Sequence, residues 1–309
     1  MSRIVLGTRG SALALAQATL TEQAFAKVFP GLETAREVFV TRGDKKLDLS
    51  LIRSIEAGGK GLFTKELEDA LLAGTIDIAV HSLKDMPGHQ PEGLQLTAVL
   101  ERAPTADVLI TRELKSFAKL PNGALIGTSS VRRARQIQAL RKDVRIEEWR
   151  GNVQTRLRKL LERKDVTGIV LAEAGLRRLG YQWTDGVLES DAGKFYAISL
   201  GDQLLPAIGQ GAIALQSRIG DSTTNARLAK INHEPTWTCI RAERELQRLL
   251  AGDCSLPVGV RTRLNGPRLE MSVILFGADG ETPATASTKG SADDPEAVAQ
   301  SLFRKLSLK

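Results

Sequence analysis

Cysteine, histidine and aromatic residues are scarce in this chain of 309 residues. Its 2 cysteines and 3 histidines leave little room for a disulfide framework or a zinc site built from these ligands, so we expect no bound metal. Aromatic residues make up only 4%, which disfavours a surface that stacks on single-stranded nucleic acid. No run of about 18 apolar residues occurs, and the N-terminus lacks the apolar stretch of a secretory signal. These absences favour a cytoplasmic protein without a membrane partner.

A surplus of positive charge accompanies an otherwise ordinary composition. Hydrophobic residues make up 42% of the chain and charged residues 26%, as in globular proteins. The length suggests two or three domains. The net charge of +7 favours an anionic partner, which can be nucleic acid, acidic lipid, or a small polycarboxylate or phosphate ligand.

Short apolar runs alternate with amphipathic segments over the first two thirds of the chain, as in βαβ units. A polar break at 101–104 divides them into two similar α/β blocks, which predicts two lobes with a cleft between them. The expected strands are 4–6, 37–40, 76–80, 94–100, 108–111, 124–127, 145–149 and 168–172. The last eighty or so residues instead predict a small α+β domain, with helices at 236–250 and 294–306 around a hairpin at 258–276.

Three of the predicted strand-to-helix turns combine small residues, hydroxyl groups and arginine. They are TRGS at 8–11, GTSSVRR at 127–133 and RGNVQTR at 150–156. Helix N-termini offer N–H groups and a positive dipole end to anions, and arginine grips a carboxylate with two hydrogen bonds. Helix capping is a sufficient explanation for any one of these turns. Three turns that face one cleft favour a multiply anionic ligand between the lobes.

Three further segments have both a functional and a purely structural interpretation. The glycine-rich stretch 57–63 is either a loop that approaches a ligand or a flexible connector. The segment 81–87 places a lysine and an aspartate at the end of a strand, which suits acid–base chemistry, although spacing alone favours a surface ion pair. Cys239 lies in an amphipathic helix and is expected to be a buried small residue, whereas the turn at 252–257 can expose the reactive thiol of Cys254.

Together these motifs resemble those of the porphobilinogen deaminase (hydroxymethylbilane synthase) family. The matching stretches, in the family's order, are TRGS at 8–11, GGKGLF at 58–63, AVHSLKDMP at 79–87, GTSSVRR at 127–133, RGNVQTR at 150–156, LAEAGLRRLG at 171–180, LPAIGQGA at 205–212 and the cysteine turn. The resemblance implies a transferase that joins four porphobilinogen molecules head to tail, with release of ammonia, into linear hydroxymethylbilane for porphyrin and haem biosynthesis. It also implies a monomer.

The resemblance further implies a dipyrromethane cofactor, assembled from two substrate units and held by a thioether to Cys254. Asp85 would be the catalytic residue that stabilises the cationic azafulvene formed when ammonia leaves, and whether it acts first as acid or base stays open. The residues implied to bind the cofactor are Ser82, Lys84, Thr128, Ser129, Ser130, Arg132 and Arg133. The residues implied to bind substrate are Arg9, Ser11, Lys60, Phe63, Arg150, Arg156, Arg178 and Gln210. The cationic residues among them would pair with the acetate and propionate groups of the growing pyrrole chain.

The fold implied by the resemblance is a pair of lobes like those of type II periplasmic binding proteins, plus a small α+β C-terminal domain. The chain would cross twice between the lobes, so 1–100 and 206–228 form lobe 1, 105–203 form lobe 2, and 233–309 carry the cofactor. Residues 179–200 are expected to be a surface excursion.

Two rival functions are a ligand-binding module of the same fold without catalysis and a nucleic-acid binder. The Cys254 turn and the lack of a secretory or DNA-binding segment argue against the first. We expect no nucleic-acid partner, because the arginines should line a cleft rather than an open face.

Overall fold

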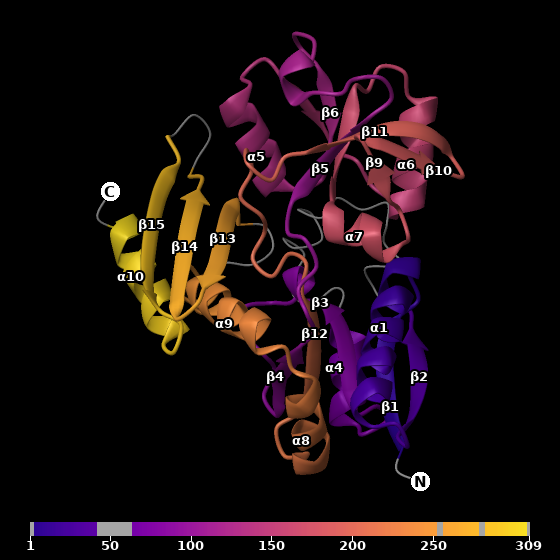
Figure 1. Ribbon diagram of the computed structural model, residues 1–309, viewed down its shortest axis with the longest axis vertical. Coiled ribbons are helices and arrows are strands. Elements are labelled where there is room, and N and C mark those ends of the chain that lie inside the picture. The colour runs from indigo at the N-terminus through magenta and orange to yellow at the C-terminus, as the bar shows by residue number, and fades with distance from the viewer. Residues whose placement is uncertain (1–2, 42–63, 252–255, 278–281, 308–309) are drawn as a thin grey trace.

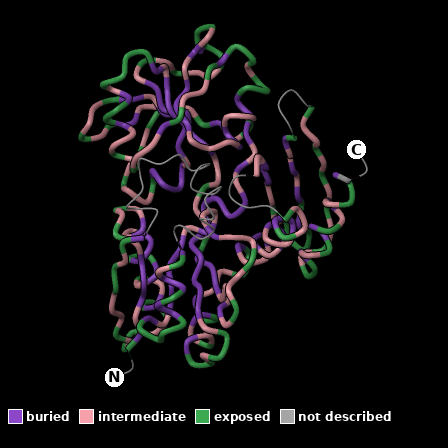
Figure 2. The backbone as a smooth tube through the Cα atoms, turned by 180° about the vertical axis from the view of Figure 1, so that it is seen from behind, coloured by how far each residue is buried: buried purple, intermediate pink, exposed green. Residues whose placement is uncertain are grey.

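The computed structural model describes residues 3–41, 64–251, 256–277 and 282–307. Within them the strands form three separate sheets, each covered by its own helices (Figure 1). Buried residues concentrate along the strands at the centre of each part (Figure 2). The segment around Cys254 and the glycine-rich stretch with Lys60 and Phe63, two of the predicted site segments, lie outside the described residues.

The first sheet, which with its helices we call lobe 1, has the strand order β2-β1-β3-β12-β4. Its strands are β1 (Arg3–Arg9), β2 (Glu33–Phe39), β3 (Ile78–Ser82), β4 (Leu94–Val99) and β12 (Ile213–Arg218). Its helices are α1 (Ala12–Val28), α4 (Lys65–Leu72) and α8 (Ser222–Ile231). β1 pairs in parallel with β2 and β3, whereas β12 runs antiparallel to both β3 and β4. The chain therefore leaves this lobe after β4 and returns to it with β12.

The second sheet, which with its helices we call lobe 2, has the order β7-β6-β8-β5-β11-β10-β9. Its strands are β5 (Asp107–Thr111), β6 (Leu125–Gly127), β7 (Arg145–Glu147), β8 (Gly168–Ala172), β9 (Trp183–Thr184), β10 (Val187–Ser190) and β11 (Gly193–Ser199). Its helices are α5 (Val131–Leu140), α6 (Val153–Glu162) and α7 (Glu173–Arg178).

The segment 179–200 is not the surface excursion that we expected. It supplies β9, β10 and β11, and β11 pairs antiparallel with β5 inside the sheet. Leu188 and Phe195 are fully buried in the core of lobe 2. The expectation was wrong because this segment pairs through β11 with β5, a strand far away in the sequence, and buries its apolar residues in the core of lobe 2.

The third part is a meander of β13 (Val258–Asn265), β14 (Arg268–Leu275) and β15 (Ala284–Ser291), packed against α9 (Glu234–Leu249) and α10 (Pro295–Ser307). The predicted hairpin is confirmed, with Gly266 in the left-handed conformation at its turn. The strand β15 was not predicted because its sequence, ATASTKGS, has no large apolar residue. α9 lies between this sheet and lobe 1, where Ile240 packs with Met86 and Val99 (Figure 1).

Two adjacent chain segments connect the lobes. The first runs from β4 to β5 and the second from β11 to β12, and Ala103 donates its N–H to the carbonyl of Gly211 across them at 3.1 Å. Gly211 has φ +86°, and a Cβ atom there would lie 2.4 Å from the Ala103 carbonyl oxygen, so only glycine fits. Two crossings and an antiparallel returning strand define a pair of type II periplasmic-binding-protein-like lobes, here joined to a small α+β domain.

Candidate active site

Each of the three predicted anion-binding turns begins a helix with a capping side chain. Ser11, Ser130 and Asn152 accept a hydrogen bond from the backbone N–H three residues further on, at 3.3, 3.4 and 2.8 Å. These bonds satisfy one orphan donor of each first turn. All three side chains therefore cap their helices, and this role is compatible with a ligand bound at the same turns.

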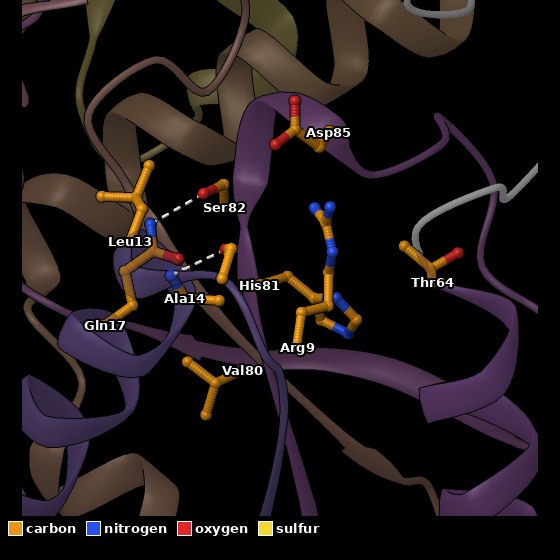
Figure 3. A pocket seen from close by; sticks show the side chains of 10 residues that line it. Arg9, Leu13, Ala14, Gln17, Thr64, Val80, His81, Ser82 and Asp85 are labelled. Atoms are coloured by element: carbon orange, nitrogen blue, oxygen red, sulfur yellow. Dashed lines mark hydrogen bonds between the residues drawn. The ribbon is translucent and has the colours of Figure 1, made fainter. Parts of the chain in front are cut away.

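A pocket lies at the carboxyl ends of β1 and β3 in lobe 1 (Figure 3). The described residues that line it are Arg9, Ser11, Leu13, Ala14, Gln17, Thr64, Val80, His81, Ser82 and Asp85. Four of them, Arg9, Ser11, Ser82 and Asp85, are predicted site residues. They meet because β1 and β3 are parallel neighbours whose carboxyl ends share one edge of the sheet. Within this lining Asp85 is the only acid.

Buried neighbours hold the turn that carries Asp85. A single 3-10 turn, Leu83–Asp85, directly follows β3. Leu83 and Met86, which flank Lys84 and Asp85 in the sequence, are almost completely buried. A Cβ atom on Gly209, in the second crossing, would lie 2.4 Å from Leu83. The crossing therefore packs tightly on this turn and fixes the backbone from which Asp85 extends.

Lys84 brings the lobe 1 pocket next to the cations of lobe 2. Burial lowers the pKa of its ammonium group, and Arg133 and Arg132 lower it further. The carboxylates of Asp85 and Asp107 oppose this change. One half-buried lysine is thus within electrostatic reach of charged groups from both lobes.

Asp107, which the sequence did not single out, is the centre of the lobe 2 site. Its side chain has no exposed surface, and its carboxylate lies 2.7 Å from Arg132 Nη1 and 2.8 Å from Arg133 Nη2. Gln210 Nε2, from the second crossing, donates to the same carboxylate at 3.0 Å. The two guanidinium groups hold the pKa of Asp107 well below its usual range despite burial, which acts to raise it. The only sequence signal for Asp107 was an acid at the first position of an apolar strand.

The other predicted arginines differ in whether an acid faces them. Arg150 donates to Glu148 at 2.7 Å. Arg156 and Arg178 make no ion pair with the described part of the chain, and donate instead to backbone carbonyls at 2.7 and 2.6 Å. Burial lowers the pKa of both to about 10, which leaves both cationic at neutral pH. Their charge is available to an anionic ligand.

Several predicted hydroxyl and amide groups bind within the protein. Ser129 Oγ donates to the carbonyl of Trp149 at 2.8 Å and accepts its N–H at 3.1 Å, which ties the turn at 127–133 to the one at 150–156. Thr128 Oγ1 accepts the Ser130 N–H at 3.2 Å. The Gln210 amide is buried and also donates to the carbonyl of Thr105 at 2.6 Å. These groups position the arginine turns.

The predicted burial of Cys239 is confirmed. It lies in the core of the third part, and burial raises the pKa of its thiol. Among the residues with assigned positions, no group of three His, Cys, Asp or Glu side chains could hold a metal ion. Within the same residues, no helix is both long and apolar enough to cross a membrane.

Two lobes that bring cations together with the carboxyl groups of Asp85 and Asp107 define a two-lobed α/β protein suited to an anionic ligand. A family model described as "Porphobilinogen deaminase, dipyromethane cofactor binding domain" matches residues 4–226, and "Porphobilinogen deaminase, C-terminal domain" matches 237–307. Porphobilinogen deaminase of Syntrophobacter fumaroxidans is 45% identical, covering 93% of this chain and 89% of its own. That of Moorella thermoacetica is 43% identical, covering 99% and 93%. The chain belongs to the porphobilinogen deaminase family.

Among solved structures, the BenM effector binding domain with its effector benzoate is similar at 14% identity and a TM-score of 0.43, covering 74% of this chain and 90% of that one. As a member of its family, the protein is a deaminating transferase of porphyrin biosynthesis with a dipyrromethane cofactor.

The donor set between the lobes fits a group that carries carboxylates. Arg132 Nε is buried and makes no hydrogen bond with the described residues, although a guanidinium N–H is an obligatory donor. Arg156 and Arg178 make no ion pair with an acid among the described residues. An orphaned donor and unmatched cations are the features that a polycarboxylate ligand would satisfy.

Proposed function

We propose that this enzyme joins four porphobilinogen molecules head to tail between lobe 1 and lobe 2, releasing ammonia at each step, to give hydroxymethylbilane. The observation that carries the proposal is the pocket that holds Asp85 and Arg9 together, next to Lys84 and the cations of lobe 2. A carboxyl group in this pocket, close to cations, suits a substrate that must lose an amine while its carboxylates are held.

Asp85 acts as the catalytic carboxyl group. Loss of ammonia requires a proton on the leaving amine and leaves a positive charge on the pyrrole, and one carboxyl group beside the substrate serves both needs. The buried side chains of Leu83 and Met86 fix its turn, so the carboxyl group is positioned before substrate binds. Ser11 and Ser82 line the same pocket and supply neutral hydrogen bonds.

The arginines hold the carboxylates in two different ways. Arg156 and Arg178 offer a full charge each, because no acid among the described residues faces them. Arg132 and Arg133 both pair with Asp107, so the net formal charge of these three side chains is +1. They therefore offer the ligand a rigid set of N–H donors rather than two uncompensated cations. Arg9 and Arg150 complete the substrate contacts, with Lys60 and Phe63 from outside the described residues.

The cofactor is held by the turns of lobe 2 and by the third domain. When bound, dipyrromethane supplies the pyrrole carbon to which the first substrate unit is added. Ser82, Lys84, Thr128, Ser129, Ser130, Arg132 and Arg133 would hold its carboxylates. Cys254 is the attachment residue, because Cys239 is buried in a hydrophobic core. In this division 1–100 with 206–228 carry the acid, 105–203 the arginines, and 233–309 the cofactor.

The mass of the purified protein tests this assignment. We expect the intact mass to exceed the sequence mass by two linked pyrrole units. Cys254→Ala should abolish the excess, whereas the matched Cys239→Ala should retain it. Asp85→Asn should keep the fold and the excess mass and lose at least about 100-fold in turnover, the usual contribution of a general acid. An unmodified mass in active protein, or near-normal turnover of Asp85→Asn, would overturn the assignment.

We also propose that the enzyme works as a cytoplasmic monomer without a nucleic-acid partner. The pocket with Asp85, the arginines of lobe 2 and Cys254 all belong to one chain. Arg132 and Arg133 are buried against Asp107 and so form no open cationic face. Sedimentation at working concentration should give a mass near 33.4 kDa, and DNA should not bind at physiological salt.

A further inference from the structure

His81 lies in the wall of the pocket beside Asp85, and none of the roles assigned above uses it. It is the fourth residue of β3, and its imidazole is buried on the face of the sheet that α4 covers. His81 Nε2 lies 3.0 Å from Oε1 of Gln216, a fully buried residue of β12. The ring is therefore anchored through one of its two nitrogen atoms.

The neighbours of Gln216 determine which imidazole nitrogen carries hydrogen. Gln216 Nε2 lies 2.8 Å from Gln90 Oε1 and 3.5 Å from Glu68 Oε1. The Glu68 carboxylate oxygen can only accept, whichever way the two amides are placed, so it favours the Gln216 amide nitrogen on this side, and Gln90 then presents its oxygen to the same nitrogen. Gln216 Oε1 then faces His81, and since this oxygen can only accept, His81 Nε2 must carry the hydrogen. In the neutral ring the lone pair is consequently on Nδ1.

The surroundings of His81 keep its ring neutral. Burial lowers the pKa of His81 to about 4, and the nearby Arg9 guanidinium acts in the same direction, against the hydrogen bond to Gln216. His81 Nδ1 makes no hydrogen bond with the described residues. The pocket wall therefore contains a neutral acceptor, held in one tautomer and one orientation, in the same lining as Arg9 and Asp85.

We propose that His81 Nδ1 accepts a hydrogen bond from a nitrogen-bound hydrogen of porphobilinogen and so positions the substrate against Asp85. This inference rests on the proposed function. Porphobilinogen donates only through its ammonium and pyrrole nitrogens, since its carboxylates are acceptors and need a cation such as Arg9 instead. A weakly basic acceptor orients an N–H group without removing its proton, which leaves proton transfer to the carboxyl group of Asp85.

Two isosteric variants of His81 separate this role from a structural one. Asparagine places an oxygen acceptor two bonds from Cβ, where Nδ1 is, but gives up the contact to Gln216. Glutamine reaches the position of Nε2 and keeps that contact, but has no acceptor at the Nδ1 position. If Nδ1 binds substrate, His81→Gln should lose about 5- to 10-fold more in kcat/KM than His81→Asn. An His81→Gln variant as active as His81→Asn, or more active, would overturn the inference.

Controls keep this result distinct from failure of the proposed function. Both variants must retain the excess mass and a cooperative thermal transition, and the wild type must form hydroxymethylbilane from porphobilinogen. The exposed His89 provides the matched control, so His89→Gln should leave kcat/KM unchanged. An analogue with methyl in place of the aminomethyl group identifies the donor. If His81 binds the pyrrole N–H, the inhibition constant of this analogue should differ between His81→Gln and the wild type. If His81 binds the ammonium group, which the analogue lacks, the two inhibition constants should be equal.

Nuclear magnetic resonance of the wild-type holoenzyme tests the tautomer directly, even if the variants fail to fold. The chain has only 3 histidines, so long-range ¹⁵N–¹H spectra of labelled protein are readily assigned. We expect His81 to be neutral, with hydrogen on Nε2, at pH 7. A ring that is charged at this pH, or that carries its hydrogen on Nδ1, would contradict the proposal.

Discussion

Replacing Asp107 with asparagine removes the carboxylate that faces Arg132 and Arg133. The side chains of the two arginines are 5% and 8% exposed and that of Asp107 is 0% exposed, so solvent screens these pairs very little. Removing one partner of a buried pair costs about 3–5 kcal/mol because the other charge is left buried without compensation. We expect Asp107→Asn to lower the free energy of unfolding by about this amount at pH 7.

The pH dependence of this loss follows from the lowered pKa of Asp107. The folded-state pKa lies below the unfolded value of about 3.9, so the stabilisation is fully present above about pH 4. It is lost as the pH falls from there toward the folded-state pKa. The difference in stability between the wild type and Asp107→Asn should therefore shrink below about pH 4.

Urea unfolding of the holoenzyme between pH 7 and pH 3 measures both effects. Asp143→Asn is the matched control, because Asp143 pairs with Arg141 at 2.8 Å in lobe 2 but on the surface. Exposed pairs contribute little, so this variant should unfold almost like the wild type. Equal stability of the two variants at pH 7 would refute the buried network around Asp107. A deficit of Asp107→Asn that is unchanged at pH 3 would refute the pH argument.

Two further substitutions test how the three parts of the chain are joined. Glu243, on α9, is fully buried and binds Arg102 of the first crossing at 2.6 Å, so Glu243→Gln should cost about 3–5 kcal/mol in urea unfolding. The ion pair between Arg241 of the same helix and Glu296 is more exposed, at 40% and 34%, so Glu296→Gln should cost little, and an equal loss in that variant would contradict this reasoning. Gly211→Ala should lower the melting temperature by several degrees, because its Cβ atom would meet a backbone oxygen at 2.4 Å, whereas Gly220→Ala has open space and should not.

Local patterns predicted the elements that depend on neighbouring residues alone. The caps at Ser11, Ser130 and Asn152 begin their helices as expected, because a capping bond reaches only three residues along the chain. The strand at 168–172 coincides with β8, whose apolar run is buried. The strands at 183–199 were missed because β11 pairs with β5, a strand far away in the sequence, and the strand at 284–291 was missed because it has no large apolar residue.

The sequence by itself determined the family, the excess of positive charge and three of the residues that line a pocket with Asp85. Only the tertiary structure decided which cations are available to a ligand. Asp107 compensates Arg132 from 25 residues away, whereas Arg156 and Arg178 face no acid among the described residues. The physical reason is that charge compensation depends on the distance between groups and on their burial. Composition and spacing along the chain contain neither quantity.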